Sequence, residues 1–385
     1  MLDYQLKQFQ KFKSKNIFKY CSSIIINNFR FIILLIIGIM IFLFIYLYKK
    51  EINNDYIIYI PKQIKNKNYY VHEIICSTKI KLNNNCFKIE DYKIEGNENK
   101  YERRLMINNL NNIVLSISKI IPNNKEEEKN FSLKNSANWN VITNKLILPY
   151  TKAIIGQLFI NDCIDIENKK EIKKILILGL GGGSISNYLA EIKGNNEIIS
   201  IEIDPAIEYI ARKWFGLKNK QNHKIIIQDA IEFIKNWENK DGQFKCIIID
   251  VCSNLINNNT LYPLICPINE LVHNEIIITK MFEMLKETGT LLINTFVFET
   301  KFNKIRVAKE RKFLLELFSY YFGYCYYVDI LYNKILICTL NSILNGKIMT
   351  NKLYKEKVEK IPDWVQNEIK ENNFQINILN DIYIN

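Results

Sequence analysis

The fold is decided by residues 175–194, which read ILILGLGGGSISNYLAEIKG. The opening ILIL is an unbroken apolar run, typical of a strand that is buried on both faces of a parallel sheet. Four glycines follow within the next five residues, and then comes a helical apolar pattern. Glycines at a strand-to-helix turn permit a tight bend and let a ligand approach the backbone closely. The stretch predicts the first βα unit of a nucleotide-binding sheet, with a purely structural turn as the alternative.

Strand and helix patterns continue to alternate on the C-terminal side of this unit. EIISIEID (197–204), HKIIIQD (223–229) and FKCIIIDV (244–251) read as buried strands, each followed by a helical pattern. A further strand, TLLINTFVF (290–298), precedes a helix and the two closing strands 324–330 and 334–340. This alternation predicts an α/β, doubly wound, Rossmann-like sheet with a closing hairpin, the order of class I methyltransferases.

Polar residues at the ends of the predicted strands define a candidate pocket. Glu202 stands 21 residues after Gly181, where an acid accepts the ribose hydroxyls of a nucleotide in this fold. Asp204 before Pro205 is interpreted as a helix cap, with contact to the ligand as the alternative. Asp229, next to Ala230, either accepts the exocyclic amine of an adenine or caps the following helix. Asp250 follows four apolar residues and ends the fourth strand at the crevice where such sheets bind ligands, which predicts a role in the site.

The N-terminal part contains a candidate transmembrane helix. Residues 31–48, FIILLIIGIMIFLFIYLY, include no charge and lie between Arg30 and Lys49. Such a helix is about 27 Å long, close to the hydrocarbon core of a bilayer. We expect a single-pass membrane protein, with a cleaved signal sequence or a buried helix as alternatives. Basic residues flank both ends, so the side of the membrane stays undetermined.

The remaining patterns suggest a small leader domain before the predicted sheet. Short apolar runs rich in Ile, Val and Tyr indicate β structure, and residues 148–160 have a helical pattern that leads into the core. The predicted domains are an N-terminal tail (1–30), the transmembrane helix (31–48), a linker (49–68), a β-rich leader with its lead-in helix (69–160), the Rossmann-like domain (161–345) and a C-terminal helical tail (346–385).

Composition excludes some classes of function. The net charge of +12 accompanies an excess of Lys, Asn and Ile, so we do not interpret it as a nucleic-acid-binding signal. Nine cysteines occur without a C-x-x-C pair, and neither a zinc site nor a disulfide-rich scaffold is indicated. Cys76 and Cys86 are close enough in sequence to bridge, but we favour two ordinary thiols. No metal site and no nucleic-acid partner are expected.

Seven motifs together resemble the spermidine-synthase-like methyltransferase family, and within it most closely the C-terminal domain of methyltransferase-like protein 13. They are LGLGGGSIS (178–186), IEIDP (201–205), ARKWFG (211–216), QDAIEFI (228–234), IIIDV (247–251), CPINELV (266–272) and GTLLINTF (289–296). The resemblance implies methyl transfer to a protein amine and a possible homodimer. It also implies that S-adenosylmethionine is bound by Gly179, Gly181, Gly183, Glu202, Asp229 and Ala230.

Three departures from spermidine synthases limit this resemblance. The glycine loop continues with Ser184 instead of Asp, and only Asp250 remains of a D-S-S-D motif. Residues Tyr150, Thr151 and Lys152 replace a Tyr-His-Glu segment. Polyamines need several carboxylates, so aminopropyl transfer is disfavoured. We expect Asp250 to orient the acceptor amine as the catalytic residue, and an inactive scaffold is the main alternative.

Overall fold

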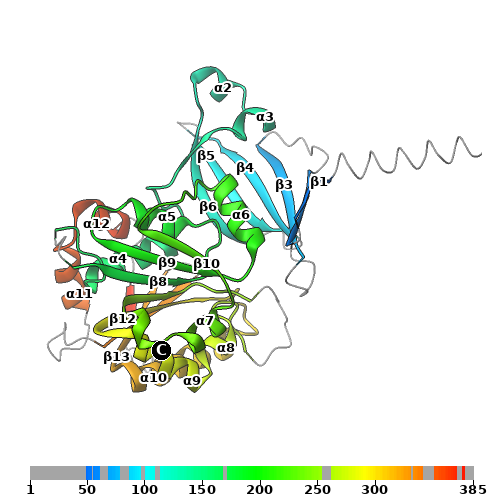
Figure 1. Cartoon of the computed structure of the whole chain (residues 1–385). Coiled ribbons are helices and arrows are strands. Elements are labelled where there is room, and N and C mark those ends of the chain that lie inside the picture. Colours follow the sequence, from blue (N-terminus) through cyan, green and yellow to red (C-terminus); the bar gives the residue numbers. More distant parts are fainter. Residues whose placement is uncertain are drawn as a thin grey trace, which may run out of the picture.

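The computed structural model describes residues 49–53, 55–60, 68–78, 86–96, 100–108, 113–167, 171–253, 262–330, 333–340, 351–370 and 375–377. These residues form two sheets and the helices that cover them (Figure 1). The strands are β1 (Lys49–Asn53), β2 (Tyr56–Tyr59), β3 (Tyr69–Ser77), β4 (Cys86–Ile94), β5 (Lys100–Ile107), β6 (Val114–Ile121), β7 (Asn140–Ile142), β8 (Lys173–Leu178), β9 (Asn196–Glu202), β10 (His223–Ile227), β11 (Phe244–Ile249), β12 (Leu285–Phe296), β13 (Tyr324–Asp329), β14 (Asn333–Thr339) and β15 (Gln375–Asn377). The helices are α2 (Lys125–Lys129), α3 (Leu133–Ser136), α4 (Pro149–Ile160), α5 (Ser184–Glu191), α6 (Pro205–Trp214), α7 (Ala230–Asn236), the 3₁₀ turn η1 (Asn239–Asp241), α8 (Asn269–Val272), α9 (Glu275–Met284), α10 (Lys304–Phe322), α11 (Asn351–Val358) and α12 (Asp363–Lys370).

The leader is a seven-stranded antiparallel sheet whose strands, β1 to β7, pair in sequence order. The stretch 49–68, expected to be a linker, contributes β1 and β2 to it. Alternation along β2 buries Tyr56 and Ile58 against Ile75 and Phe87 of the neighbouring strands. The side chains of α6 complete this apolar cluster, so the leader shares a core with the second sheet's helical layer.

The second sheet confirms the predicted doubly wound α/β architecture. Its strand order is β10-β9-β8-β11-β12-β14-β13-β15, parallel from β10 to β12 and antiparallel beyond. The order reverses between β8 and β11, which creates the crevice where open α/β sheets bind ligands. β13 and β14 form the predicted closing hairpin, and β15, from the expected helical tail, adds to its outer edge.

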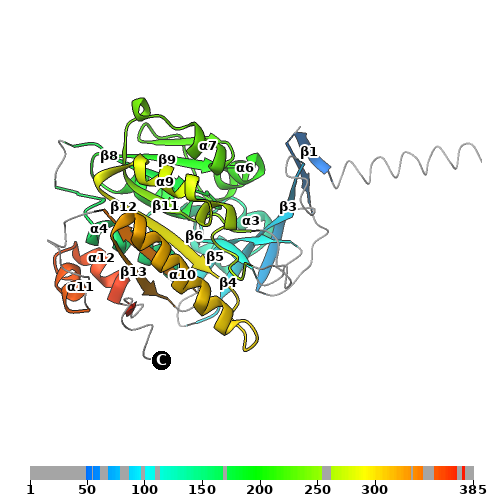
Figure 2. The same ribbon diagram turned by 90° about the horizontal axis from the view of Figure 1, so that it is seen from below.

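Helices cover both faces of the second sheet (Figures 1 and 2). One face packs against α4, α5, α11 and α12, and the other packs against α7, α8, α9 and α10. The central strands are therefore buried on both sides, which explains why β8 ends in the apolar run ILIL and β11 ends in three Ile residues.

A buried polar network holds the leader against α6. Arg103 on β5 donates to both oxygens of Asp91 at 2.7 and 2.8 Å and to the carbonyl of Trp214 at 3.1 Å. His72 lies 2.7 Å from the same carboxylate and stacks on the Trp214 ring. Burial opposes ionisation, but Arg103 and His72 outweigh it and hold the pKa of Asp91 below its usual value. The ARKWFG motif therefore joins the two parts of the protein.

Three disulfides among the described residues correct the interpretation of the cysteines as ordinary thiols. Cys76 and Cys86 face each other on β3 and β4 and are bonded, and Cys325 and Cys338 are bonded in the same way across β13 and β14. The third disulfide joins Cys252 to Cys266. Strand register places these pairs opposite each other, and that register is not visible in the spacing of cysteines along the chain. Cys163 and Cys246 are free and buried.

The predicted membrane location is wrong for the part of the chain that the structure describes, because no helix there is both long and apolar enough to cross a bilayer. The longest helix among those residues, α10, has 19 residues and carries charges such as Lys304, Lys309 and Lys312 along its length. A bilayer core would leave these charges unsolvated. The predicted span 31–48 lies outside the described residues.

Candidate active site

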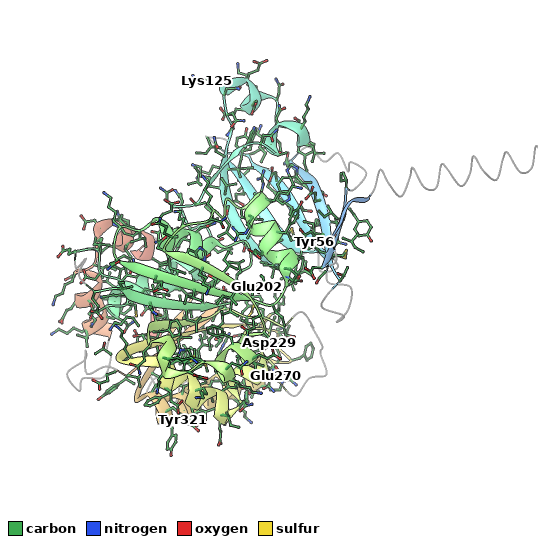
Figure 3. All side chains as sticks on the ribbon, viewed as in Figure 1. Tyr56, Lys125, Glu202, Asp229, Glu270 and Tyr321 are labelled. Atoms are coloured by element: carbon green, nitrogen blue, oxygen red, sulfur yellow. A yellow bond between two sulfur atoms is a disulfide. The ribbon has the colours of Figure 1, made fainter. Side chains whose placement is uncertain are left out.

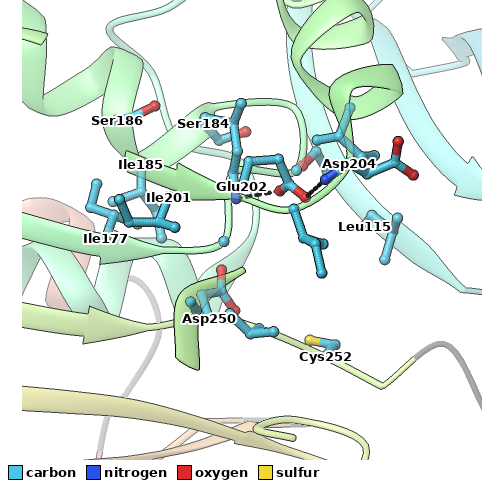
Figure 4. Close-up of a pocket in the computed structure, with 18 of the residues that line it drawn as sticks. Leu115, Ile177, Ser184, Ile185, Ser186, Ile201, Glu202, Asp204, Asp250 and Cys252 are labelled. Carbon is cyan, nitrogen blue, oxygen red and sulfur yellow. Dashed lines mark hydrogen bonds between the residues drawn. The ribbon is translucent and has the colours of Figure 1, made fainter. Parts of the chain in front are cut away.

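A cavity of about 330 Å³ opens between the carboxyl edge of the second sheet and β6 of the leader (Figure 4). This volume is within the usual range for small-molecule sites. Figure 3 shows Glu202 and Asp229 near the place where the two parts of the protein meet. The lining residues that carry the site are Leu115, Ser116, Tyr150, Gly179, Leu180, Gly181, Ser184, Glu202, Asp229, Ala230, Asp250, Val251, Cys252 and Ser253.

The glycine turn is shaped by close contacts with the rest of the protein. Gly179 has a φ of +95°, and a Cβ there would lie 2.5 Å from the carbonyl oxygen of Asp250. A Cβ on Gly182 would lie 2.8 Å from the Cβ of Ser116 and 2.9 Å from the ring of Phe215. The Gly182 amide also donates to Ser116 Oγ at 2.8 Å. Glycine is thus required at position 179, where the turn touches Asp250 and lines the cavity, and at position 182, where it touches the leader.

Glu202 is placed at the end of β9, as the sequence predicts, and its carboxylate enters the cavity (Figure 4). Its Oε2 accepts the Leu180 amide at 3.0 Å and its Oε1 accepts the Asp204 amide at 2.9 Å. Burial raises the pKa of Glu202 to about 7, and these backbone hydrogen bonds oppose the rise. Asp204 caps α6 through the Ala206 amide at 2.9 Å, in agreement with the predicted cap.

Asp229 has the capping role that the sequence left open. Its Oδ1 accepts the amides of Ile231 and Glu232 at 2.7 and 3.1 Å, at the start of α7. Asp229 and Ala230 both line the cavity, on the same side as Glu202. The cap fixes the orientation of the carboxylate, so capping and ligand binding are compatible at this position. Contact with an adenine stays a prediction.

Asp250 lies at the centre of a hydrogen-bond chain inside the cavity. Its Oδ2 accepts from the hydroxyl of Tyr150 at 3.2 Å, and its Oδ1 accepts from Nδ2 of Asn294 at 2.8 Å. Asn333 donates in turn to Oδ1 of Asn294 at 2.8 Å. Burial raises the pKa of Asp250 to about 6, and the two donors oppose this rise. Burial, together with the charge of Asp250, raises the pKa of Tyr150 well above its usual value.

Sequence reasoning missed two of these partners. Asn294 lies in β12, one residue after Ile293, which pairs with Ile249 of β11. The signal that identifies it is an Asn that directly follows the buried apolar run 291–293. In the sequence, Tyr150 was noted only because its segment differs from the Tyr-His-Glu segment of spermidine synthases. Its position on the first turn of α4 places it next to Asp250.

The segment after Asp250 is fastened to the chain before α8. Ser253 donates its amide to the carbonyl of Ile265 at 2.7 Å, and Ile268 donates to the carbonyl of Val251 at 3.2 Å. The Cys252–Cys266 disulfide lies between these two hydrogen bonds. Cys252 lines the cavity, so the disulfide forms part of the wall next to the catalytic candidate.

Comparison with known proteins identifies the type of domain. Residues 169–359 match the family model described as a methyltransferase domain. The chain carries a methyltransferase domain. The match confirms, at the level of the domain, the predicted S-adenosylmethionine-dependent methyltransferase class and the cofactor of that class.

One curated relative agrees with this result. An eEF1A lysine and N-terminal methyltransferase homolog of Drosophila pseudoobscura pseudoobscura is 26% identical over 40% of this chain and 22% of its own length. The chain thus spans about a fifth of that curated relative. The structure of human methyltransferase-like protein 13 with SAH is similar at 19% identity, covering 58% of this chain and 92% of that one, with a TM-score of 0.44.

A probable spermidine synthase from Corynebacterium glutamicum ATCC 13032 is 15% identical to this chain. The two structures align over 76% of this chain and 89% of the synthase, with a TM-score of 0.52. The aligned part of this chain is longer than the segment 169–359 that matches the methyltransferase family model. This likeness supports the fold of the chain and carries no information on its substrate.

Proposed function

We propose that the protein transfers a methyl group from S-adenosylmethionine to an amine of a protein acceptor. The observation that carries this proposal is the buried carboxylate of Asp250, held by Tyr150 and Asn294 in the same cavity as Glu202. The relative named for methylation of lysine and N-terminal amines of a protein supports the class of acceptor.

At the cofactor end, Glu202 would accept the ribose hydroxyls and Asp229 the exocyclic amine of the adenine. The positions of both carboxylates at strand ends next to the glycine turn support these roles. Glu202 already has both oxygens oriented by backbone amides, so little reorganisation is needed when a ligand enters. Gly179, Gly181 and Ala230 line the cavity and would provide backbone contacts around the ligand. Gly183, also expected to bind the cofactor, does not line the cavity and is instead the N-cap residue of α5.

At the acceptor end, S-adenosylmethionine supplies a methyl group on a positively charged sulfur. Asp250 would accept a hydrogen bond from the acceptor amine and take the proton that this amine loses. A carboxylate with a pKa of about 6 is largely ionised at neutral pH and still basic enough to share a proton. Tyr150 and Asn294 fix its two oxygens, which is the kind of positioning on which an in-line displacement depends.

Aminopropyl transfer to a polyamine is the rival reaction for this fold. The lining acids of the cavity are Glu202, Asp204, Asp229 and Asp250, and the first three lie at the cofactor end. Beyond Asp250, the described wall continues with Val251, then Cys252 in a disulfide. One carboxylate at the acceptor end suits a single amine better than a polycation.

The leader sheet also supports a proposed homodimer. Its strand order is open, with β1 and β7 at the two edges, so another copy could pair there. Light scattering on the purified protein, with the mass expected to be twice that of one chain, tests this assembly.

The proposal is tested by titrating the full-length protein with S-adenosylmethionine and with its decarboxylated analogue in a calorimeter. We expect clear preference for S-adenosylmethionine. Preference for the analogue would favour aminopropyl transfer, and no heat with either would indicate an inactive scaffold.

A further inference from the structure

An exposed apolar and basic surface lies on the segment that connects β12, at the proposed acceptor end of the cavity, to α10. β12 carries Asn294, the partner of Asp250, and continues through Phe296 into α10. Figure 2 shows the connection between β12 and α10 projecting from the molecule. Phe302 in this connection is fully exposed and Ile305, on the first turn of α10, is 73% exposed. Neither side chain contributes to a core of this structure.

The same surface also carries three basic side chains. Lys301, Lys304 and Arg306 are exposed and have no ion pair within the described part of the chain. The two acids nearest in sequence are engaged elsewhere: Glu299 pairs with Arg311, and Glu310 pairs with His273. We call Lys301, Phe302, Lys304, Ile305 and Arg306 the rim patch.

We propose that the rim patch binds an acidic segment of the protein acceptor that carries an apolar anchor residue. This inference rests on the proposed function, because it assigns the acceptor's docking site. Exposed aromatic and aliphatic side chains ringed by charge are typical of protein interfaces, where a few apolar anchors carry most of the affinity. Unpaired cations around them attract a partner of opposite charge and orient its approach.

The composition of the rim patch favours a protein segment over a nucleic acid. Single-stranded nucleic acids bind to successive aromatic platforms on which bases stack. Here Phe302 is the sole ring of the patch, and Ile305 offers no face for stacking. An aliphatic anchor next to cations instead matches an acidic peptide with one apolar side chain.

The test uses the full-length protein and a short fluorescein-labelled peptide of Glu and Asp residues around a central Leu. Its binding is measured by fluorescence anisotropy for the wild type and for the double variant Phe302→Ala and Lys304→Glu. The matched control combines Tyr320→Ala, 84% exposed at the other end of α10, with Lys235→Glu, exposed on α7. Binding of S-adenosylmethionine to each variant is measured by calorimetry as a control for folding. All four substituted residues lie outside the cavity lining.

We expect the rim variant to bind the peptide about tenfold or more weakly, and the control to match the wild type. Cofactor binding should be unchanged in both. Equal peptide binding by the rim variant and the wild type would overturn the proposal. It would also be overturned if the rim patch bound single-stranded RNA or anionic vesicles and did not bind the peptide. If the wild type and both variants failed to bind S-adenosylmethionine, the proposed function would be refuted. The anisotropy titration would still show whether the rim patch binds the peptide.

Discussion

The hydroxyl of Tyr150 donates a hydrogen bond of 3.2 Å to the carboxylate of Asp250, across 100 residues of sequence. Asn294 holds the other oxygen at 2.8 Å. The carboxylate is thus fixed from α4 on one side and from β12 on the other while it lines the cavity. We propose that this carboxylate is the base at the acceptor end of the site.

Replacing Tyr150 with Phe should shift the pH profile of methyl transfer. The pKa of Asp250 is raised to about 6 by burial, and the hydrogen bond from Tyr150 lowers it. Loss of that bond raises the pKa further, so the rise of kcat/KM with pH moves to higher pH, by about one unit or less. Cofactor affinity should stay the same. An unshifted profile would show that Tyr150 does not position Asp250.

Cofactor binding should itself depend on pH through Glu202. Its pKa is raised to about 7, so the carboxylate is protonated below that value and loses its strength as an acceptor. Calorimetric titrations should therefore show weaker S-adenosylmethionine binding as the pH falls through 7.

The variant Glu202→Gln separates this effect from other titrations. We expect about tenfold weaker binding, with the pH dependence near 7 removed. Glu232→Gln, an exposed acid on α7, is the matched control and should behave as the wild type. A Glu202→Gln protein that keeps the wild-type pH dependence would refute the assignment.

Gly182→Ala should destabilise the protein through the contact between the glycine turn and the leader. The added Cβ would meet Ser116 and Phe215 at under 3 Å. Overpacking of this kind costs about 1–3 kcal/mol in the free energy of unfolding, measured by denaturant titration. Wild-type stability would mean that β6 moves away at no cost and that the leader does not close the cavity tightly.

Arg103→Ala should loosen the leader from α6. It leaves Asp91 buried without its guanidinium partner, and removal of one member of a buried ion pair costs about 3–5 kcal/mol. The free energy of unfolding should fall accordingly. Because Asp91 has a lowered pKa, its stabilising contribution exists at neutral pH and is lost as acid protonates it, so the variant and the wild type should converge in acid.

The sequence predicted the parts of the site that depend on one strand at a time. Glu202 and Asp250 each end an apolar run, and the order of a parallel sheet places such ends along one edge. Tyr150 and Asn294 depend instead on how α4 packs and how β12 is aligned, which no local pattern records. The disulfides were missed for the same reason, since strand register decides which cysteines face each other.

Strand content before residue 69 was also underestimated. β1 and β2 lie in a Lys- and Asn-rich stretch that resembles a linker. β1 pairs with β2, and β2 pairs with β3 and packs Tyr56 and Ile58 into the apolar cluster of the leader. The membrane location was inferred from one uncharged apolar run and its basic flanks, and it finds no support in the described helices.

The most direct test of the central claim compares wild-type protein with Asp250→Asn, using tritium-labelled S-adenosylmethionine and a protein extract from the source organism. Both proteins should bind the cofactor with similar affinity in the calorimeter. We predict that the wild type transfers the label to protein and that Asp250→Asn transfers at least about a hundredfold less. Equal transfer by Asp250→Asn, or no transfer by a wild type that binds the cofactor, would contradict the assignment of Asp250 as the base for a protein amine.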